Sequence, residues 1–245
     1  MYYFELALSG VWVIYMKYTN VIEGHFRSRP NRFMANVEIN GSVETVHVKN
    51  TGRCKELLIP EGRVFLQHFD STTRKTKYDL IAVYKERQGK EPLLINMDSQ
   101  APNKAVAEWL AGGLFSKNAL VRSEVPYKNS RFDFYVEDSG RKAFVEVKGV
   151  TLENNGIAAF PDAPTERGIK HLRELMQCME DGFDAYVLFV VQMKEVHIMK
   201  PNDATHKAFG DALRDAIKAG VKAFAVDCII TPDEMKIDSF IDTKI

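Results

Sequence analysis

The segment at residues 130–151 decides the fold of this chain. It reads Ser-Arg-Phe-Asp-Phe-Tyr-Val-Glu-Asp-Ser-Gly-Arg-Lys-Ala-Phe-Val-Glu-Val-Lys-Gly-Val-Thr. Two runs of β-branched and aromatic residues flank a polar turn at 138–140, which is a pattern typical of a β-hairpin. The segment therefore predicts two neighbouring antiparallel strands.

Polar side chains interrupt both predicted strands. Successive side chains of a strand point to opposite faces, so Glu146 and Lys148 share one face of the second strand. In the first strand, Asp133 is expected on the face opposite to Phe132 and Phe134. Two neighbouring strands can thus bring two carboxylates and a lysine to one place.

Such a group of side chains is suited to hold a hard divalent cation. Mg²⁺ prefers oxygen ligands and usually takes only one or two carboxylates from a protein. We therefore predict Asp133 and Glu146 as ligands of Mg²⁺ or Mn²⁺, and Lys148 as the group that orients water or neutralises charge. This chemistry suits phosphodiester hydrolysis. The alternative is an ordinary surface ion pair between Glu146 and Lys148, which contributes little.

Short strands dominate the region from residue 19 to about residue 98. Turns that contain glycine or proline separate five expected strands, at 33–39, 42–49, 63–69, 77–84 and 93–97. Five short strands fit a small barrel, and the OB-fold is the leading candidate. We assign residues 16–100 to this domain.

Basic and aromatic residues alternate in the barrel segment 25–33. Arginine and aromatic side chains suit a surface that follows a nucleic-acid backbone and stacks on bases, so Arg29 and Arg32 are predicted to bind DNA. A strand edge protected by charge is the alternative. Asn50 lies in a tight turn whose backbone N–H groups could hold an anion, and it is assigned to the same surface; an ordinary turn without a ligand is the alternative.

Helices alternate with apolar strands in residues 101–245. Helices are expected at 103–112, 164–180 and 203–219, and strands at 120–126, 184–192, 195–199 and 221–230. This order predicts a mixed α/β domain with helices packed on a sheet. Arg167, Lys170 and His171 lie near the start of the second helix and are predicted to grip DNA phosphates, together with Arg131 of the hairpin.

Charge and cysteine content narrow the class of protein. The 33 basic and 33 acidic residues cancel, so a strongly basic nucleic-acid binder is not indicated, although a local basic patch is compatible with them. Cys54, Cys178 and Cys228 are widely spaced and form no Cys-x-x-Cys motif. We therefore expect reduced thiols and a cytoplasmic location.

The first fifteen residues are apolar and aromatic. They lack a basic start and a clear cleavage pattern, which argues against a signal peptide, and they are too short for a comfortable membrane span. We expect no membrane partner, and translation starting at Met16 would make residues 1–15 an upstream extension. Oligomeric state is left open.

Several motifs resemble the sugar fermentation stimulation protein A family. The strongest is Phe-Pro-Asp-Ala-Pro-Thr-Glu-Arg-Gly-Ile-Lys-His-Leu-Arg-Glu-Leu at 160–175. Similar motifs occur in order at 29–33, 50–53, 124–125, 130–134, 145–148 and 150–152. The likeness covers about residues 17–245.

This resemblance implies an N-terminal OB-fold joined to a domain similar to the PD-(D/E)xK nucleases. Asp133 then matches the first acidic motif, Glu146 and Lys148 match the second, and Glu124 is a further acidic neighbour in the catalytic group. The family is described as binding DNA without clear sequence preference and is linked to control of sugar (maltose) metabolism.

Three functions follow as hypotheses. The first is a metal-dependent DNA endonuclease, favoured by the complete set of Asp133, Glu146 and Lys148. The second is a non-enzymatic DNA-binding regulatory protein with a vestigial nuclease site. The third is a sugar or nucleotide sensor, because OB barrels also bind such ligands. The absence of a helix-turn-helix signature argues against a sequence-specific repressor.

Overall fold

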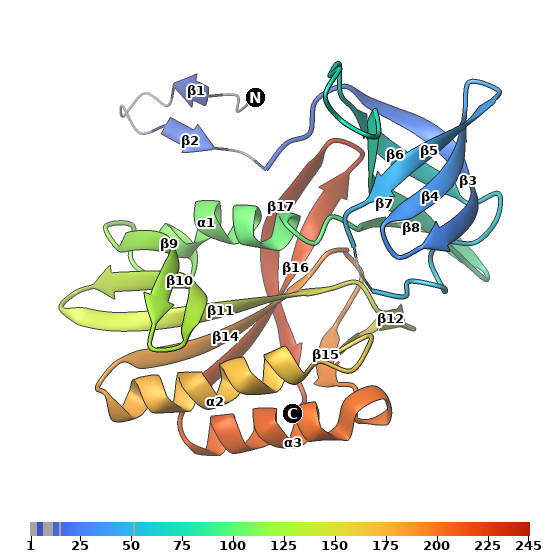
Figure 1. The fold of residues 1–245 in the computed structure, drawn as a ribbon. Helices are drawn as coiled ribbons and strands as arrows, with labels where there is room; N and C mark the ends of the chain where they lie inside the picture. Colours follow the sequence, from blue (N-terminus) through green and yellow to red (C-terminus); the bar gives the residue numbers. More distant parts are fainter. Residues whose placement is uncertain (1–3, 7–11, 15, 51) are drawn as a thin grey trace.

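A computed structural model describes residues 4–6, 12–14, 16–50 and 52–245 of the chain (Figure 1). Near the N-terminus, β1 (Phe4–Leu6) pairs antiparallel with β2 (Trp12–Ile14). The predicted upstream extension, residues 1–15, lies largely outside the described residues and stays a prediction. Among the described residues, no helix is both long and apolar enough to cross a membrane.

The N-terminal domain is an OB-type barrel, as predicted. Its strands are β3 (Val21–Asn31), β4 (Met34–Ile39), β5 (Ser42–Val48), β6 (Arg63–His68), β7 (Tyr78–Arg87) and β8 (Lys90–Asn96). They form an antiparallel sheet in the order β5-β4-β3-β6-β7-β8, and a parallel pairing of β5 with β7 closes the first five into a barrel. The predicted strand at 93–97 belongs to β8, outside this closure, while β3 was not predicted.

Alternating burial explains why these segments form the barrel. In β4, Ala35, Val37 and Ile39 point into the core and the residues between them are half-buried. Gly24 lets β3 cross closely over β4, because a Cβ there would lie 2.7 Å from Cγ1 of Val37.

The C-terminal domain is a nine-stranded mixed sheet with helices on both faces. Its strands, in spatial order, are β12 (Glu153–Asn154), β13 (Ile157–Phe160), β15 (Ile198–Pro201), β17 (Glu234–Thr243), β16 (Lys222–Thr231), β14 (Asp184–Val191), β11 (Arg141–Val150), β10 (Ser130–Asp138) and β9 (Leu120–Tyr127). The helices are α1 (Ala101–Gly113), α2 (Glu166–Glu180) and α3 (Asp203–Lys218). Helix α1 packs on one face, and α2 and α3 cover the other (Figure 1). This architecture confirms the predicted mixed sheet with flanking helices.

The hairpin predicted at 130–151 is present as β10 and β11. Its register runs from Asp138 opposite Arg141 to Phe134 opposite Val145. One prediction about its faces was wrong, because Phe132 packs toward α2 whereas Phe134 packs in the cluster that contains α1 residues. Regular alternation stops between them at Asp133, where backbone pairing with both neighbouring strands is interrupted.

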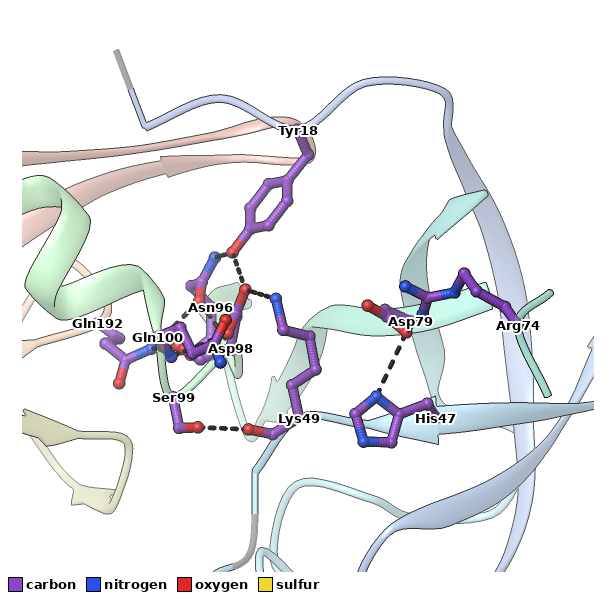
Figure 2. Close-up of polar contacts among 10 residues, drawn as sticks. All are labelled: Tyr18, His47, Lys49, Arg74, Asp79, Asn96, Asp98, Ser99, Gln100 and Gln192. Atoms are coloured by element: carbon purple, nitrogen blue, oxygen red, sulfur yellow. Dashed lines mark hydrogen bonds and ion pairs between the residues drawn. The ribbon is translucent and has the colours of Figure 1, made fainter. Parts of the chain in front are cut away.

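A buried polar network joins the two domains (Figure 2). The carboxylate of Asp98 is fully buried and pairs with Nζ of Lys49 at 2.5 Å. Tyr18 donates to the same Asp98 oxygen at 3.3 Å, and Asn96 donates to the Tyr18 hydroxyl at 3.0 Å. Burial, and then the charge of Asp98, raise the pKa of Tyr18. Gln192, directly after β14, donates to the backbone oxygens of Asn96 at 3.0 Å and Asp98 at 3.2 Å, so the network holds the barrel against the second sheet.

Candidate metal centre

Glu146 lies in the middle of β11, on the face that α2 covers. Only 3% of the residue is exposed. Its Oε1 accepts a hydrogen bond from Nζ of Lys148 at 2.5 Å and another from Nδ1 of His171. Its Oε2 is buried and has no hydrogen-bond partner among the described residues. A buried carboxylate oxygen without a partner is costly to a fold, so Oε2 of Glu146 is a candidate ligand for a cation.

The surroundings of Glu146 keep its carboxylate charged. Burial raises the pKa of Glu146, but the hydrogen bond from His171 and the charge of Lys148 outweigh this effect, so the net pKa lies below the ordinary value. An ionised carboxylate with one free oxygen is the form that a metal ion requires.

Asp133 lies on β10, next to the last registered pair of the hairpin. Its Oδ2 accepts the backbone N–H of Val147 at 2.7 Å, and its Oδ1 accepts Nδ2 of Asn103 at 2.7 Å. Burial, and then the charge of Glu146, raise the pKa of Asp133 to about 6. The negative charge of Glu146 therefore opposes ionisation of Asp133, and a divalent cation held by both carboxylates would relieve that repulsion.

His171 is held in a defined tautomer. Nε of Arg167 donates to Nε2 of His171 at 3.3 Å. A guanidinium only donates hydrogen bonds, so Nε2 is the acceptor and Nδ1 carries the proton that is donated to Glu146. Helix α2 presents both residues in this geometry because Thr165 caps its first turn by accepting the backbone N–H of Gly168. His171, predicted to grip phosphates, thus contacts the carboxylate of Glu146, and Arg167, predicted for the same role, contacts His171.

The remaining acidic and basic candidates of this domain lie apart from that group. Glu124 forms an ion pair with Arg131 at 2.8 Å, and both side chains are more than half exposed. Lys170 is also exposed and donates to the backbone oxygen of Asn129 at 3.2 Å. Arg131 and Lys170 therefore remain accessible to a ligand at the surface.

Arg29 of the barrel is turned toward its own domain. Its two terminal nitrogens donate to the backbone oxygens of Gly52 and Arg53, and of Arg32 and Asn50. Four carbonyl acceptors make Arg29 a support for the turn at 50–53. Its predicted contact with DNA would compete with these bonds.

Arg32 and Asn50 differ in their surroundings. Arg32 is exposed and its guanidinium lies 5.6 Å from the ring centroid of Phe33, which is itself half exposed. This pair retains the cationic and aromatic character predicted for a DNA surface. The side chain of Asn50 accepts the backbone N–H of Gly52 at 2.8 Å and so shapes the turn.

Two further polar residues, on α1 and α2, were not predicted as site residues from the sequence. Asn103, on α1, orients Asp133, although its position near a proline in a helix gave no sign of this. Glu174, on α2, is buried and its Oε2 has no partner among the described residues. In sequence it is one of many charged residues of an amphipathic helix, so its burial could not be anticipated.

The residues present fit a divalent cation with few protein ligands. The described residues contain no group of three or more His, Cys, Asp or Glu side chains arranged to hold a metal. Mg²⁺ does not need such a group, since it commonly keeps several waters and takes one or two carboxylates. The free Oε2 of Glu146, with Asp133 hydrogen-bonded to the backbone of the next residue, Val147, is compatible with that smaller requirement.

The fold and the site define the class of protein. It is a two-domain protein in which an OB-type barrel is followed along the chain by a mixed sheet that carries two carboxylates and a lysine. Comparison with known proteins identifies it further. A family profile described as the sugar fermentation stimulation protein RE domain matches residues 100–234, and one described as the SfsA N-terminal OB domain matches residues 28–91. The chain belongs to the sugar fermentation stimulation protein (SfsA) family.

Individual relatives span almost the whole chain. A protein of Desulfitobacterium hafniense named sugar fermentation stimulation protein homolog is 58% identical over 230 residues, covering 94% of this chain and 99% of the relative. A protein of Clostridium beijerinckii with the same name is 58% identical, over 93% of this chain and 99% of its own length. A solved structure of Pyrococcus furiosus SfsA in complex with Ca²⁺ matches with a TM-score of 0.80 at 27% identity, covering 94% of this chain and 98% of that one.

Proposed function

We propose that this protein is a metal-dependent, nuclease-like phosphodiesterase that acts on DNA. The observation that carries the proposal is the buried, unpartnered Oε2 of Glu146, with Asp133 and Lys148 beside it. The related Pyrococcus furiosus protein was solved in complex with Ca²⁺. Ca²⁺ and Mg²⁺ both select oxygen ligands, which supports a cation at a corresponding place in this chain.

Each side chain has a role in this mechanism. Asp133 and Glu146 would hold Mg²⁺ or Mn²⁺, which when bound supplies a more acidic water and stabilises charge on phosphoryl oxygens. Lys148 brings an ammonium group to the same place, where it neutralises the negative charge that develops on the phosphoryl group. Asn103 and His171 hold the two carboxylates in position. Exposed Arg131 and Lys170, with Arg32 on the barrel, would contact the DNA backbone.

We place this activity in the cytoplasm and connect it with sugar (maltose) metabolism. The three cysteines are buried free thiols, which supports a reducing compartment. The name of the relatives refers to sugar fermentation. In this proposal the link to sugar use is a consequence of action on DNA.

Cleavage assays test the proposal directly. Purified protein is incubated with single-stranded and double-stranded DNA in Mg²⁺, in Mn²⁺ and in chelator. We expect metal-dependent cleavage, lost by about a hundredfold or more in Glu146→Ala and Lys148→Ala. Lys142→Ala, an exposed lysine on the same strand, is the matched control and should cleave normally.

A second candidate is a non-enzymatic DNA-binding regulatory protein with a vestigial nuclease site. It is favoured by the ion pair between Lys148 and Glu146, because the same contact would serve a purely structural role. DNA binding that persists without cleavage in any metal, and that is unchanged in Lys148→Ala, would select this candidate over the enzyme.

A further inference from the structure

A polar pocket of about 110 Å³ lies where the barrel meets the second sheet. Its lining includes Asn50 from the barrel, and Gly149, Thr151, Phe160 and Asp162 from the C-terminal domain. Gly149 directly follows Lys148 on β11. A strand rises roughly 3.3 Å per residue and its side chains alternate, so Gly149 lies one residue further along β11 than Lys148 and on the opposite face, and the pocket adjoins the end of the strand that carries the candidate metal centre. It has room for several waters or for a small planar group.

The buried side chain of Gln192 presents an acceptor to this pocket. Only 2% of Gln192 is exposed. Its Nε2 donates to the backbone oxygens of Asn96 at 3.0 Å and Asp98 at 3.2 Å, and two carbonyl acceptors fix which end of the amide is the nitrogen. Figure 2 shows the amide oxygen turned away from this network. None of the hydrogen bonds found among the described residues reaches that oxygen, so Oε1 is left for a donor from a ligand.

Two glycines keep the backbone close to the acceptors of the pocket. A Cβ on Gly149 would lie 2.6 Å from Oε1 of Gln192, and a Cβ on Gly52 would lie 2.1 Å from Oδ2 of Asp162. The carboxylate of Asp162 makes no hydrogen bond or ion pair with the described residues. The pocket therefore holds two oxygen acceptors, Gln192 and Asp162, that lack donors within the described part of the chain.

The chemistry of the lining selects the kind of ligand. No cationic side chain is among the described residues that line the pocket, so the pocket does not suit a phosphate. Asn50 uses its side-chain oxygen on Gly52, which leaves its NH₂ as a donor, and Phe160 adds an aromatic ring. Acceptors, a donor and a ring together match the edge and face of a nucleobase, and bases outside a duplex are recognised in this way.

We propose that this pocket receives one unpaired base of the DNA strand whose phosphodiester lies at the metal centre. The proposal rests on the proposed function, since it takes DNA as the substrate. Gln192 and Asp162 both accept hydrogen bonds, so the preferred base has an exocyclic amino group with two N–H donors, as in cytosine, adenine and guanine, whereas thymine offers the single donor N3–H. The pocket thus gives the protein a preference among bases without any element in a DNA groove.

Binding measured in chelator tests the pocket separately from cleavage. Fluorescence anisotropy compares oligo-deoxycytidylate with oligo-thymidylate, each about 12 nucleotides long. We expect about tenfold tighter binding of the cytosine strand. Asp162→Asn removes the negative charge and replaces one of the two acceptor oxygens with an NH₂ donor, so the ratio should fall toward one. Asp70→Asn removes the same charge from a side chain that is 85% exposed on the barrel, and it should keep the ratio.

A modified ligand makes the test independent of any variant's folding. An N4,N4-dimethylcytosine strand keeps the ring but loses the amino donors, so it should bind like oligo-thymidylate. Equal binding of all strands, or a ratio unchanged by both Asp162→Asn and the methylated base, would overturn the pocket while leaving DNA binding intact. Failure to bind single-stranded and double-stranded DNA alike would remove the proposed function, and the pocket proposal with it.

Discussion

The imidazole of His171 and the carboxylate of Glu146 form a buried hydrogen-bonded pair, with the proton on Nδ1. The pair occupies Oε1 of Glu146 and leaves Oε2 without a partner. A histidine predicted to meet phosphate thus acts on the orientation of a candidate metal ligand. Side chains that orient ligands in this way commonly affect metal affinity as well as the fold.

Loss of the hydrogen bond that Nδ1 of His171 donates to Glu146 should weaken metal binding. We expect His171→Phe to lower Mn²⁺ affinity about 10- to 100-fold, and His171→Asn, which keeps a short donor, to lose less. Isothermal titration with Mn²⁺ measures this. Arg173→Ala, an exposed change on the same helix, is the control, and equal affinity in all four proteins would contradict the role of His171.

Protons should compete with the metal at Asp133. Burial and the charge of Glu146 raise the pKa of this carboxyl to about 6, so it gains a proton as the pH falls below that value. Mn²⁺ affinity should be nearly constant above pH 7 and fall about tenfold per pH unit below pH 6. Titrations between pH 5 and pH 8 test this, and a flat profile across that range would refute it.

Glu108 should make the stability of the protein depend on alkaline pH. Burial, and then the charge of Glu234, raise the pKa of Glu108 to about 8, and its Oε1 is buried without a partner among the described residues. The folded state therefore holds a proton that the unfolded chain releases near pH 4.5, so this stabilisation is complete below pH 4.5 and is lost as the pH rises through 8. Glu108→Gln should be more stable than wild type at pH 8.5 by on the order of 1 kcal/mol, after allowance for solvent screening.

Thermal unfolding at several pH values tests the role of Glu108. The advantage of the glutamine variant should shrink steadily as the pH is lowered toward 5. Glu180→Gln, an exposed glutamate at the end of α2, is the control. A constant difference between Glu108→Gln and wild type at all pH values would argue against a titrating Glu108.

Alanine variants of Arg29 and Arg32 should differ in effect: the first should lower the stability of the protein, and the second should weaken its binding to DNA. Arg29→Ala loses four hydrogen bonds to backbone oxygens, and we expect it to cost about 2–4 kcal/mol of unfolding free energy. Arg32→Ala should change stability by less than about 0.5 kcal/mol. It should instead reduce the slope of log affinity for DNA against log salt by about one. An unchanged slope would assign Arg32 to protection of the strand edge.

The buried pair between Lys49 and Asp98 should be costly to break from one side. Lys49→Met leaves the Asp98 carboxylate buried, with Tyr18 as its one side-chain partner in the described part of the chain, and we expect about 3–5 kcal/mol of destabilisation. The double variant Lys49→Met with Asp98→Asn should recover part of that loss. Additive losses in denaturant unfolding would show that the two residues do not act as a pair.

Much of the architecture could be predicted because local patterns and burial agree. The strand 184–192 reads as a continuous apolar run, and β14 is buried from its second residue onward. The hairpin of β10 and β11 follows from its turn and its alternating residues. Failures occurred where a strand is very short, as in β12 and β13, or where it carries polar residues on both sides. β3 contains glycine, histidine, arginine and proline, and β17 has six charged or hydroxyl residues among ten.

Only part of the candidate site could be predicted from the sequence, and the reason is physical. Register along one strand follows from sequence, so the shared face of Glu146 and Lys148 could be predicted. The local break at Asp133 depends on the backbone N–H of Val147, which no pattern reveals. Contacts from α1 and α2 depend on how the helices pack, and so Asn103 was missed and the contact of His171 with Glu146 was not anticipated.

The outer strand β9 has a consequence for how the protein behaves in a crowded solution. An open sheet edge offers unpaired N–H and C=O groups to another chain and invites aggregation. Here Pro126 has no N–H to offer, and Glu124 adopts a positive φ of 56° that bends the strand out of line. The ion pair of Glu124 with Arg131 places charge at the same bend. Glu124 and Arg131, predicted from the sequence to act in catalysis and in DNA binding, thus also protect the edge of the sheet from pairing with a strand of another molecule.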